Sequence, residues 1–149
     1  MEMNETRAER FYDRIRKNIH GYLQNKGSAI EKSGDYLLLV PDIFILLFRL
    51  AKDPRVTGKN KVLLGSSLVY YVIPLDFIPE ALLGPMGYLD DLVFGVYVLN
   101  KILIDTDPAI VREHWSGKGD VLDSIQRVLN AADSLVGSDV LSRFKNMMK

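Results

Sequence analysis

Residues 63–99 read LLGSSLVYYVIPLDFIPEALLGPMGYLDDLVFGVYVL, and this stretch decides the predicted fold. It contains no Lys, Arg or His, although four carboxylates interrupt it. The four acids are Asp76, Glu80, Asp90 and Asp91. A proline lies just before each of the first two acids, and the segment Gly-Pro-Met-Gly lies just before the last two. We interpret the stretch as two apolar helices joined by a proline-kinked corner.

Helical spacing continues on both sides of this hairpin. Apolar residues recur every three or four positions, with charged residues between them, which is typical of amphipathic helices. Pro41 and Pro108 fit the first positions of two helices, and Asp107 and Asp120 fit N-caps. The predicted helices cover residues 4–26, 41–52, 58–72 and 88–104, a short helix or turn from Asp107, and two C-terminal helices within 120–149.

The predicted fold class is all-α. No run of alternating residues is flanked by hairpin turns, so strands are not expected. A chain of 149 residues fits one domain with a core of its own. We therefore predict a compact single domain over residues 1–149, with about six helices around the central Pro-kinked hairpin.

Charge and cysteine content limit the functional classes. Nineteen Lys and Arg balance nineteen Asp and Glu, so no basic footprint for nucleic acid is visible. The chain has no cysteine, which excludes disulfides and thiolate metal sites and suits a reducing compartment. The charged N-terminal residues lack the apolar region of a secretory signal. We expect a cytoplasmic protein, with a peripheral position at the inner face of the membrane as a variant of that localisation.

The apolar helices also raise the question of membrane insertion. The longest run without ionisable charge, residues 62–75, is shorter than the roughly 20 apolar residues that span a bilayer. Asp76 then lies where a longer span would have to continue, at a cost of about 2.5–3.5 kcal/mol. A plain transmembrane helix is disfavoured. The alternative is a membrane hairpin built from residues 62–75 and 92–104.

The four acids of the corner allow two interpretations. In the preferred one they lie in first helical turns, where carboxylates accept free backbone N–H groups and face the positive end of the helix dipole. In the other they converge on a shared site, and the fold then needs a compensating cation. Oxygen ligands alone would suit Mg²⁺, Mn²⁺ or Ca²⁺. An arginine is preferred to a metal as compensator, and the candidates are Arg49, Arg55, Lys101 and Arg112.

The order of these residues resembles the YkvA-like family. The matching pattern is Pro74-Leu-Asp76-Phe-Ile-Pro79-Glu80, followed by Gly87-Tyr-Leu-Asp90-Asp91, within residues 63–98. The chain departs from the family where Glu80 replaces the usual Asp. The family is a domain of unknown function found mainly in bacterial proteins. A similar domain ends a ubiquitin ligase of the endoplasmic reticulum membrane, so the resemblance implies membrane association for some relatives.

No catalytic constellation is recognised in the sequence. Ser66 and Ser67 lack a His partner and the glycines of a nucleophile elbow. His20 is expected on a helix surface, and Trp115, beside His114, is expected to cover one end of the core. The leading hypothesis is a non-enzymatic helical module that binds a protein partner or a membrane surface and is compatible with homo-oligomers. The alternative is an ion-binding protein or metal-dependent enzyme that uses the four acids. No cofactor is predicted under the leading hypothesis.

Overall fold

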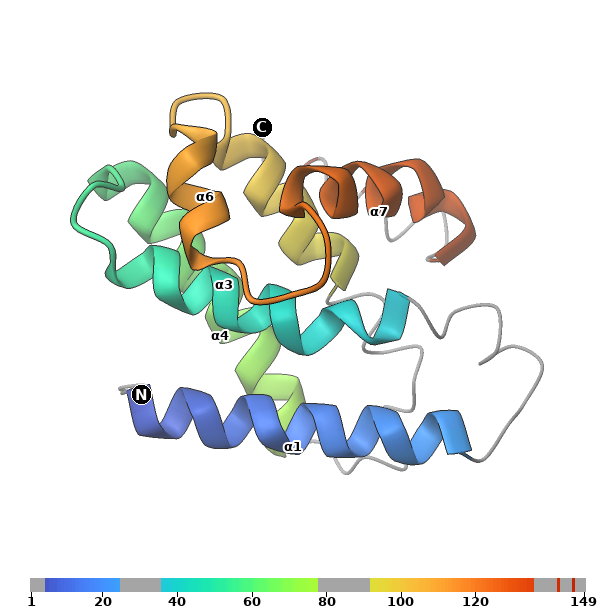
Figure 1. The fold of residues 1–149 in the computed structure, drawn as a ribbon. Helices are drawn as coiled ribbons and strands as arrows, with labels where there is room; N and C mark the ends of the chain where they lie inside the picture. Colours follow the sequence, from blue (N-terminus) through green and yellow to red (C-terminus); the bar gives the residue numbers. More distant parts are fainter. Residues whose placement is uncertain (1–4, 25–35, 78–91, 136–141, 143–145, 147–149) are drawn as a thin grey trace.

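A computed structural model describes residues 5–24, 36–77, 92–135, 142 and 146. Within these residues all regular structure is helical and no strand is present, which confirms the all-α prediction. The helices are α1 (Glu5–Gln24), α3 (Leu39–Lys52), α4 (Gly58–Phe77), a helix over residues 92–102, α6 (Pro108–His114) and α7 (Val121–Leu135). Figure 1 shows their arrangement.

Helix α3 lies at the centre of the described part of the chain. Helices α1, α4 and α6 all contact it, and α7 in turn contacts α6. In Figure 1, α1 runs below α3, and α6 lies above α3. The sequence of α3 carries hydrophobic residues almost all round, and its buried residues are Val40, Pro41, Ile43, Phe44, Ile45, Leu46, Leu47, Phe48 and Leu50. A helix that is apolar on every side is stable only where neighbours cover it.

Helix α1 confirms the amphipathic prediction over residues 5–24, the described part of the range 4–26. Ala8, Ile15 and Ile19 are buried, while the charged residues between them are exposed. These apolar side chains form one stripe because residues three, four or seven positions apart share a helix face. The stripe packs against α3, and the polar face of α1 remains in solvent.

Two helix starts agree with the capping pattern in the sequence. Asp107 caps α6, where its side chain accepts a hydrogen bond from the backbone N–H of Ala109 at 2.9 Å, and Pro108 occupies the first helical position. Helix α7 begins at Val121, directly after the predicted cap Asp120. Helix α3, in contrast, begins at Leu39, two residues before the predicted start.

The end of α4 differs from the prediction. The sequence analysis ends this helix at residue 72 and starts another near Pro74, but α4 continues through Pro74 to Phe77. Proline removes one backbone donor, but its fixed φ is itself helical, so a helix can continue through it. Asp76 therefore lies in the last turn of a helix, and the helix-start interpretation is wrong for this residue.

The corner itself, residues 78–91, lies outside the described residues, so the kinked hairpin stays a prediction. Beyond it, Leu92, Val93 and Val96 are buried, as expected for the helix predicted over 88–104. Among the helices that the structure describes, none has both the length and the apolar character needed to cross a membrane.

Candidate functional site

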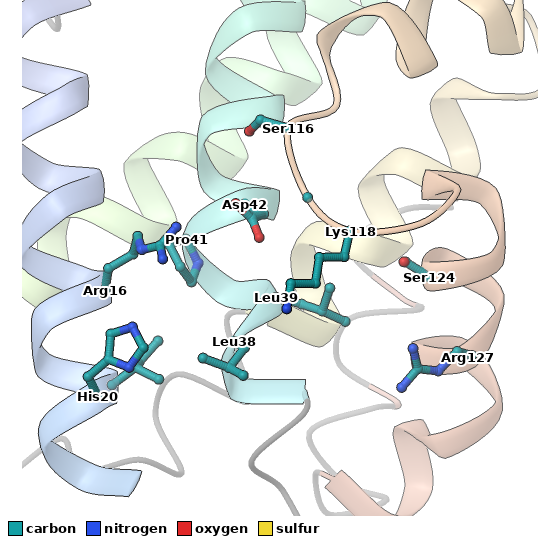
Figure 2. Close-up of a pocket in the computed structure, with 12 residues that line it drawn as sticks. Arg16, His20, Leu38, Leu39, Pro41, Asp42, Ser116, Lys118, Ser124 and Arg127 are labelled. Atoms are coloured by element: carbon teal, nitrogen blue, oxygen red, sulfur yellow. The ribbon is translucent and has the colours of Figure 1, made fainter. Parts of the chain in front are cut away.

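A cavity of about 500 Å³ opens between α1, the start of α3, the loop over residues 115–120, and α7. Figure 2 shows the side chains that line it. They are Arg16, Ile19, His20, Leu38, Leu39, Pro41, Asp42, Ser116, Gly117, Lys118, Ser124 and Arg127. We call this set the cationic pocket. Its volume is within the range of small-molecule sites.

Each wall of the cationic pocket comes from a different part of the chain. Arg16 and His20 are four residues apart on α1, so they share one helix face and point toward α3 (Figure 2). Ser124 and Arg127 are three residues apart on α7 and occupy the opposite wall. Lys118 extends from the loop above (Figure 2). The packing of α1 and α6 on α3 thus brings distant segments to one cavity.

The charge in the cationic pocket is unbalanced. Arg16, Lys118 and Arg127 carry positive charges, and Asp42 is the only carboxylate among the described residues that line the pocket. In the part of the chain that the structure describes, no carboxylate forms an ion pair with any of these three cations. Because the whole chain has equal numbers of acidic and basic residues, this local excess of positive charge is a property of the fold.

Asp42 is held by a short network that includes Arg16. The Tyr12 hydroxyl donates to Asp42 Oδ1 at 2.9 Å and accepts from Arg16 Nη1 at 2.9 Å. Burial raises the pKa of Asp42, and the hydrogen bond from Tyr12 and the charges of Arg16 and Arg49 partly oppose this shift. Burial also raises the pKa of Tyr12, so its hydroxyl keeps its proton at neutral pH. The network orients Arg16 without neutralising it.

One wall of the cationic pocket is apolar. Ile19, Leu39 and Pro41 pack against or within the core, whereas the Leu38 side chain is 41% exposed. Leu38 occupies the N-cap position of α3, where its side chain makes no capping hydrogen bond. A large apolar side chain that faces an open cavity supplies a surface on which a ligand can bury hydrocarbon.

The loop that carries Lys118 has a defined shape. The Trp115 indole packs against the core, as the sequence analysis predicts, and its Nε1 donates to the Gly119 carbonyl at 3.2 Å. A side chain at Gly117 would overlap the Trp115 ring, and Gly119 has a left-handed backbone with φ of 70°. The contacts of Trp115 with Gly117 and Gly119 therefore fix the loop that holds Lys118 beside the cavity.

The structure does not bring the four predicted acids into one described site. Asp76 lies in the last turn of α4, and Glu80, Asp90 and Asp91 lie outside the described residues. The metal interpretation of these residues and the helix-start interpretation of the last three stay predictions. The predicted arginine compensators have other partners: Arg49 donates to the His114 carbonyl at 2.9 Å, and Arg112 pairs with Asp120 at 3.1 Å.

Arg55, the other arginine candidate, belongs to a group that the sequence analysis did not find. Asp53, Arg55, Glu113 and His114 join the end of α3 to the end of α6, and we call them the Asp53 cluster. Asp53 is buried and accepts from the Arg55 backbone N–H at 2.8 Å, from Arg55 Nε at 3.0 Å and from Arg55 Nη2 at 2.7 Å. His114 Nε2 lies 2.7 Å from Asp53 Oδ2. Arg55 Nη2 also donates to Glu113.

The Asp53 cluster has the donor types of a metal site, since one ligand atom each from Asp53, Glu113 and His114 lies within 4.8 Å of the others. The guanidinium of Arg55, however, already donates to both carboxylates. Hydrogen bonds from Arg55 and His114 hold the pKa of Asp53 well below its usual range, and Arg55 lowers the pKa of Glu113. The cation that these acids require is thus part of the protein, and the cluster acts as a structural clamp.

The family match found among known proteins concerns a different part of the chain. Residues 60–95 match the family described as "Protein of unknown function (DUF1232)". The chain is 28% identical over 104 residues to "Uncharacterized protein ORF9" of Methanothermobacter thermautotrophicus. The aligned region covers 70% of this chain and 69% of the relative. No solved structure matches. The family segment includes most of α4 and the corner, whereas every residue of the cationic pocket lies outside it.

Proposed function

We propose that this chain is a non-enzymatic binding module that holds an anionic group of its ligand in the cationic pocket. The observation that carries this proposal is the convergence of Arg16, Lys118 and Arg127 on one cavity with a single carboxylate. Like charges held together in a folded protein repel, and a bound anion relieves that repulsion. Guanidinium groups and hydroxyls such as those of Ser116 and Ser124 are also the donors that phosphate and carboxylate accept.

The shape of the site favours a small anionic head over a flat protein surface. A concave cavity of about 500 Å³ encloses a compact group on several sides. Of the two partners expected from the sequence, a membrane surface fits this shape better than an extended protein interface, which typically buries about 800 Å² on each partner. A peripheral position at a membrane is consistent with such a ligand.

We also infer that the chain is YkvA-like. The order of prolines and acids over residues 74–91 supports this assignment, and the match of residues 60–95 to a domain of unknown function supports the coarser family placement. In this proposal the matched segment supplies most of α4, which packs on α3. The pocket forms on other parts of the chain, namely α1, the start of α3 and α7.

The experiment that tests the proposal is a titration with inorganic phosphate at low ionic strength. Trp115 is the only tryptophan, and its ring touches Gly117 of the pocket lining, so its fluorescence reports on occupancy. We expect saturable binding that weakens about tenfold in Arg127→Gln or Lys118→Gln, because each removes a charged donor from the site. Added sodium chloride should weaken binding through screening.

The matched control is Lys59→Gln, which removes one positive charge at an exposed position in the first turn of α4. This variant should bind phosphate as the unaltered chain does. Equal weakening in Lys59→Gln and Arg127→Gln would reduce the effect to net charge and overturn the pocket as the site. The absence of saturable phosphate binding, by fluorescence and by calorimetry, would overturn the proposal itself.

A further inference from the structure

We propose that the ligand of the cationic pocket is an anionic amphiphile, with its phosphate or carboxylate head among the cations and its hydrocarbon chain against Leu38. This inference rests on the proposed function and names the ligand class. It is carried by the placement of an exposed leucine in a cavity that Arg16, Lys118 and Arg127 also line.

The two halves of such a ligand correspond to two regions of the pocket. Arg16, Lys118 and Arg127 come from three different segments and surround the cavity (Figure 2). Leu38 and Leu39 lie between α1 and α7 at the start of α3 (Figure 2). A head group that reaches the cations from this side therefore carries its chain across the leucines.

The apolar surface is otherwise unexplained by the fold. The large hydrophobic side chains that the structure shows exposed in its described part are Leu38, Val62, Val69 and Ile104. Of these four described side chains, Leu38 is the one that lines the cationic pocket. Leu38 has helical backbone dihedrals, with φ of -66° and ψ of -20°, and lies directly before the first residue of α3. A ligand that covers Leu38 gives this side chain a binding role.

A small anion would not use this surface. Inorganic phosphate reaches the cations but leaves Leu38 in water, whereas an alkyl chain removes both itself and Leu38 from water. Each methylene that becomes buried favours binding by a factor of about four. Affinity should therefore rise with chain length until the chain extends beyond the apolar wall.

The experiment compares inorganic phosphate, butyl phosphate and octyl phosphate by isothermal titration calorimetry, below the micelle concentration of the octyl compound. We expect octyl phosphate to bind at least about tenfold more tightly than butyl phosphate, since four further methylenes meet the apolar wall. Leu38→Asn should remove this dependence on chain length and keep the affinity for inorganic phosphate. Leu38 is 41% exposed, and substitutions at exposed positions usually change stability little, so this variant is expected to fold.

Val62→Asn is the matched control, because Val62 is 71% exposed on α4 and does not line the pocket. It should keep the full dependence on chain length. Equal affinities for butyl and octyl phosphate, with phosphate still bound, would overturn the amphiphile and leave the proposed function standing. Loss of chain-length dependence in Val62→Asn as well as in Leu38→Asn would also overturn it. Failure of all three phosphates to bind would remove both proposals.

A second arm distinguishes a membrane lipid from a free amphiphile. Co-sedimentation with vesicles of phosphatidylcholine and phosphatidylglycerol, and with phosphatidylcholine alone, gives the comparison. Binding to the anionic vesicles that is lost in both Leu38→Asn and Arg127→Gln supports a lipid as ligand. Binding of octyl phosphate without vesicle binding supports a free amphiphile of the same chemistry.

Discussion

Asp53 shows how one carboxylate contributes to the stability of the fold when hydrogen-bonding partners contact both of its oxygens. Its two oxygens receive three hydrogen bonds from Arg55 and a contact from His114, a residue 61 positions further along the chain. These partners stabilise the ionised form, so the pKa of Asp53 is lower in the folded protein than in the unfolded chain. A lowered carboxyl pKa stabilises the fold above the unfolded pKa, and this contribution is lost as pH falls through the folded pKa.

We therefore expect Asp53→Asn to lower the midpoint of urea unfolding most strongly near neutral pH. The difference from the unaltered chain should persist down to about pH 4, the ordinary pKa of aspartate, and shrink at more acid pH. The reason is that below this pH the unfolded chain binds a proton at Asp53 while the folded protein still holds the ionised form, so acid favours the unfolded state. Urea unfolding at pH 7, 5, 4 and 3 measures the difference.

Glu113→Gln is the matched control for this prediction, because Glu113 also pairs with Arg55 but its side chain is 57% exposed. Solvent screens an exposed ion pair, so its loss should lower the midpoint less than Asp53→Asn does. A difference between Asp53→Asn and the unaltered chain that stays constant from pH 7 to pH 3 would contradict the proposed role of the ionised Asp53.

The Asp53 cluster is an example of side-chain pairing that could not be predicted from the sequence. Asp53-Pro54 reads as the end of a helix, which is correct, since α3 ends at Lys52. The pairing of Asp53 with His114 requires α6 to lie across the end of α3, and no local pattern reports that placement. The sequence predicts no role for the residues of the cationic pocket, and it places His20 only on a helix surface.

At the scale of helices, starts are encoded locally and can be tested locally. Asp107 caps α6 through its hydrogen bond with the Ala109 backbone N–H, and Pro108 fixes the first helical residue. We expect Asp107→Ala to destabilise the protein by about 1 kcal/mol, the usual effect of a lost N-cap. Asp107→Asn keeps an acceptor oxygen and should remain close to the unaltered chain. Equal losses for the two variants in urea unfolding at pH 7 would contradict the capping role.

Helix ends and helix burial were harder to predict than helix starts. The cap signals at Asp107 and Asp120 depend on neighbouring residues only, which is why they gave the starts of α6 and α7. Pro74 was interpreted as a boundary, although α4 continues past it, because proline permits helix as well as turn. The burial of α3 on nearly all sides depends on α1, α4 and α6, and the sequence analysis assigned it a single buried stripe.

At the scale of the molecule, α3 shares one hydrophobic core with buried residues of α1, α4, α6 and α7. It contacts α1 on one side and α6 on another, and α6 contacts α7. The Asp53 cluster adds a polar connection between the end of α3 and the end of α6. The cationic pocket spans α1, α3 and α7, so its geometry depends on all these contacts at once. A ligand that bridges α1 and α7 should accordingly raise the stability of the whole assembly.

The prediction of one domain over residues 1–149 follows at this scale. If α3 couples the helices, the whole chain should unfold in one transition, so Trp115 fluorescence and far-ultraviolet circular dichroism should give the same urea midpoint. Trp115 reports on the loop between α6 and α7, whereas circular dichroism reports on every helix, α1 included.

Leu46, fully buried in α3, offers the test: Leu46→Ala should lower the free energy of unfolding by about 2–5 kcal/mol by both probes. Val62→Ala, at an exposed position on α4, should change it by less than about 0.5 kcal/mol. A circular dichroism transition that begins well before the Trp115 transition would show that α1 unfolds separately, and α3 would then not unite the chain into one domain.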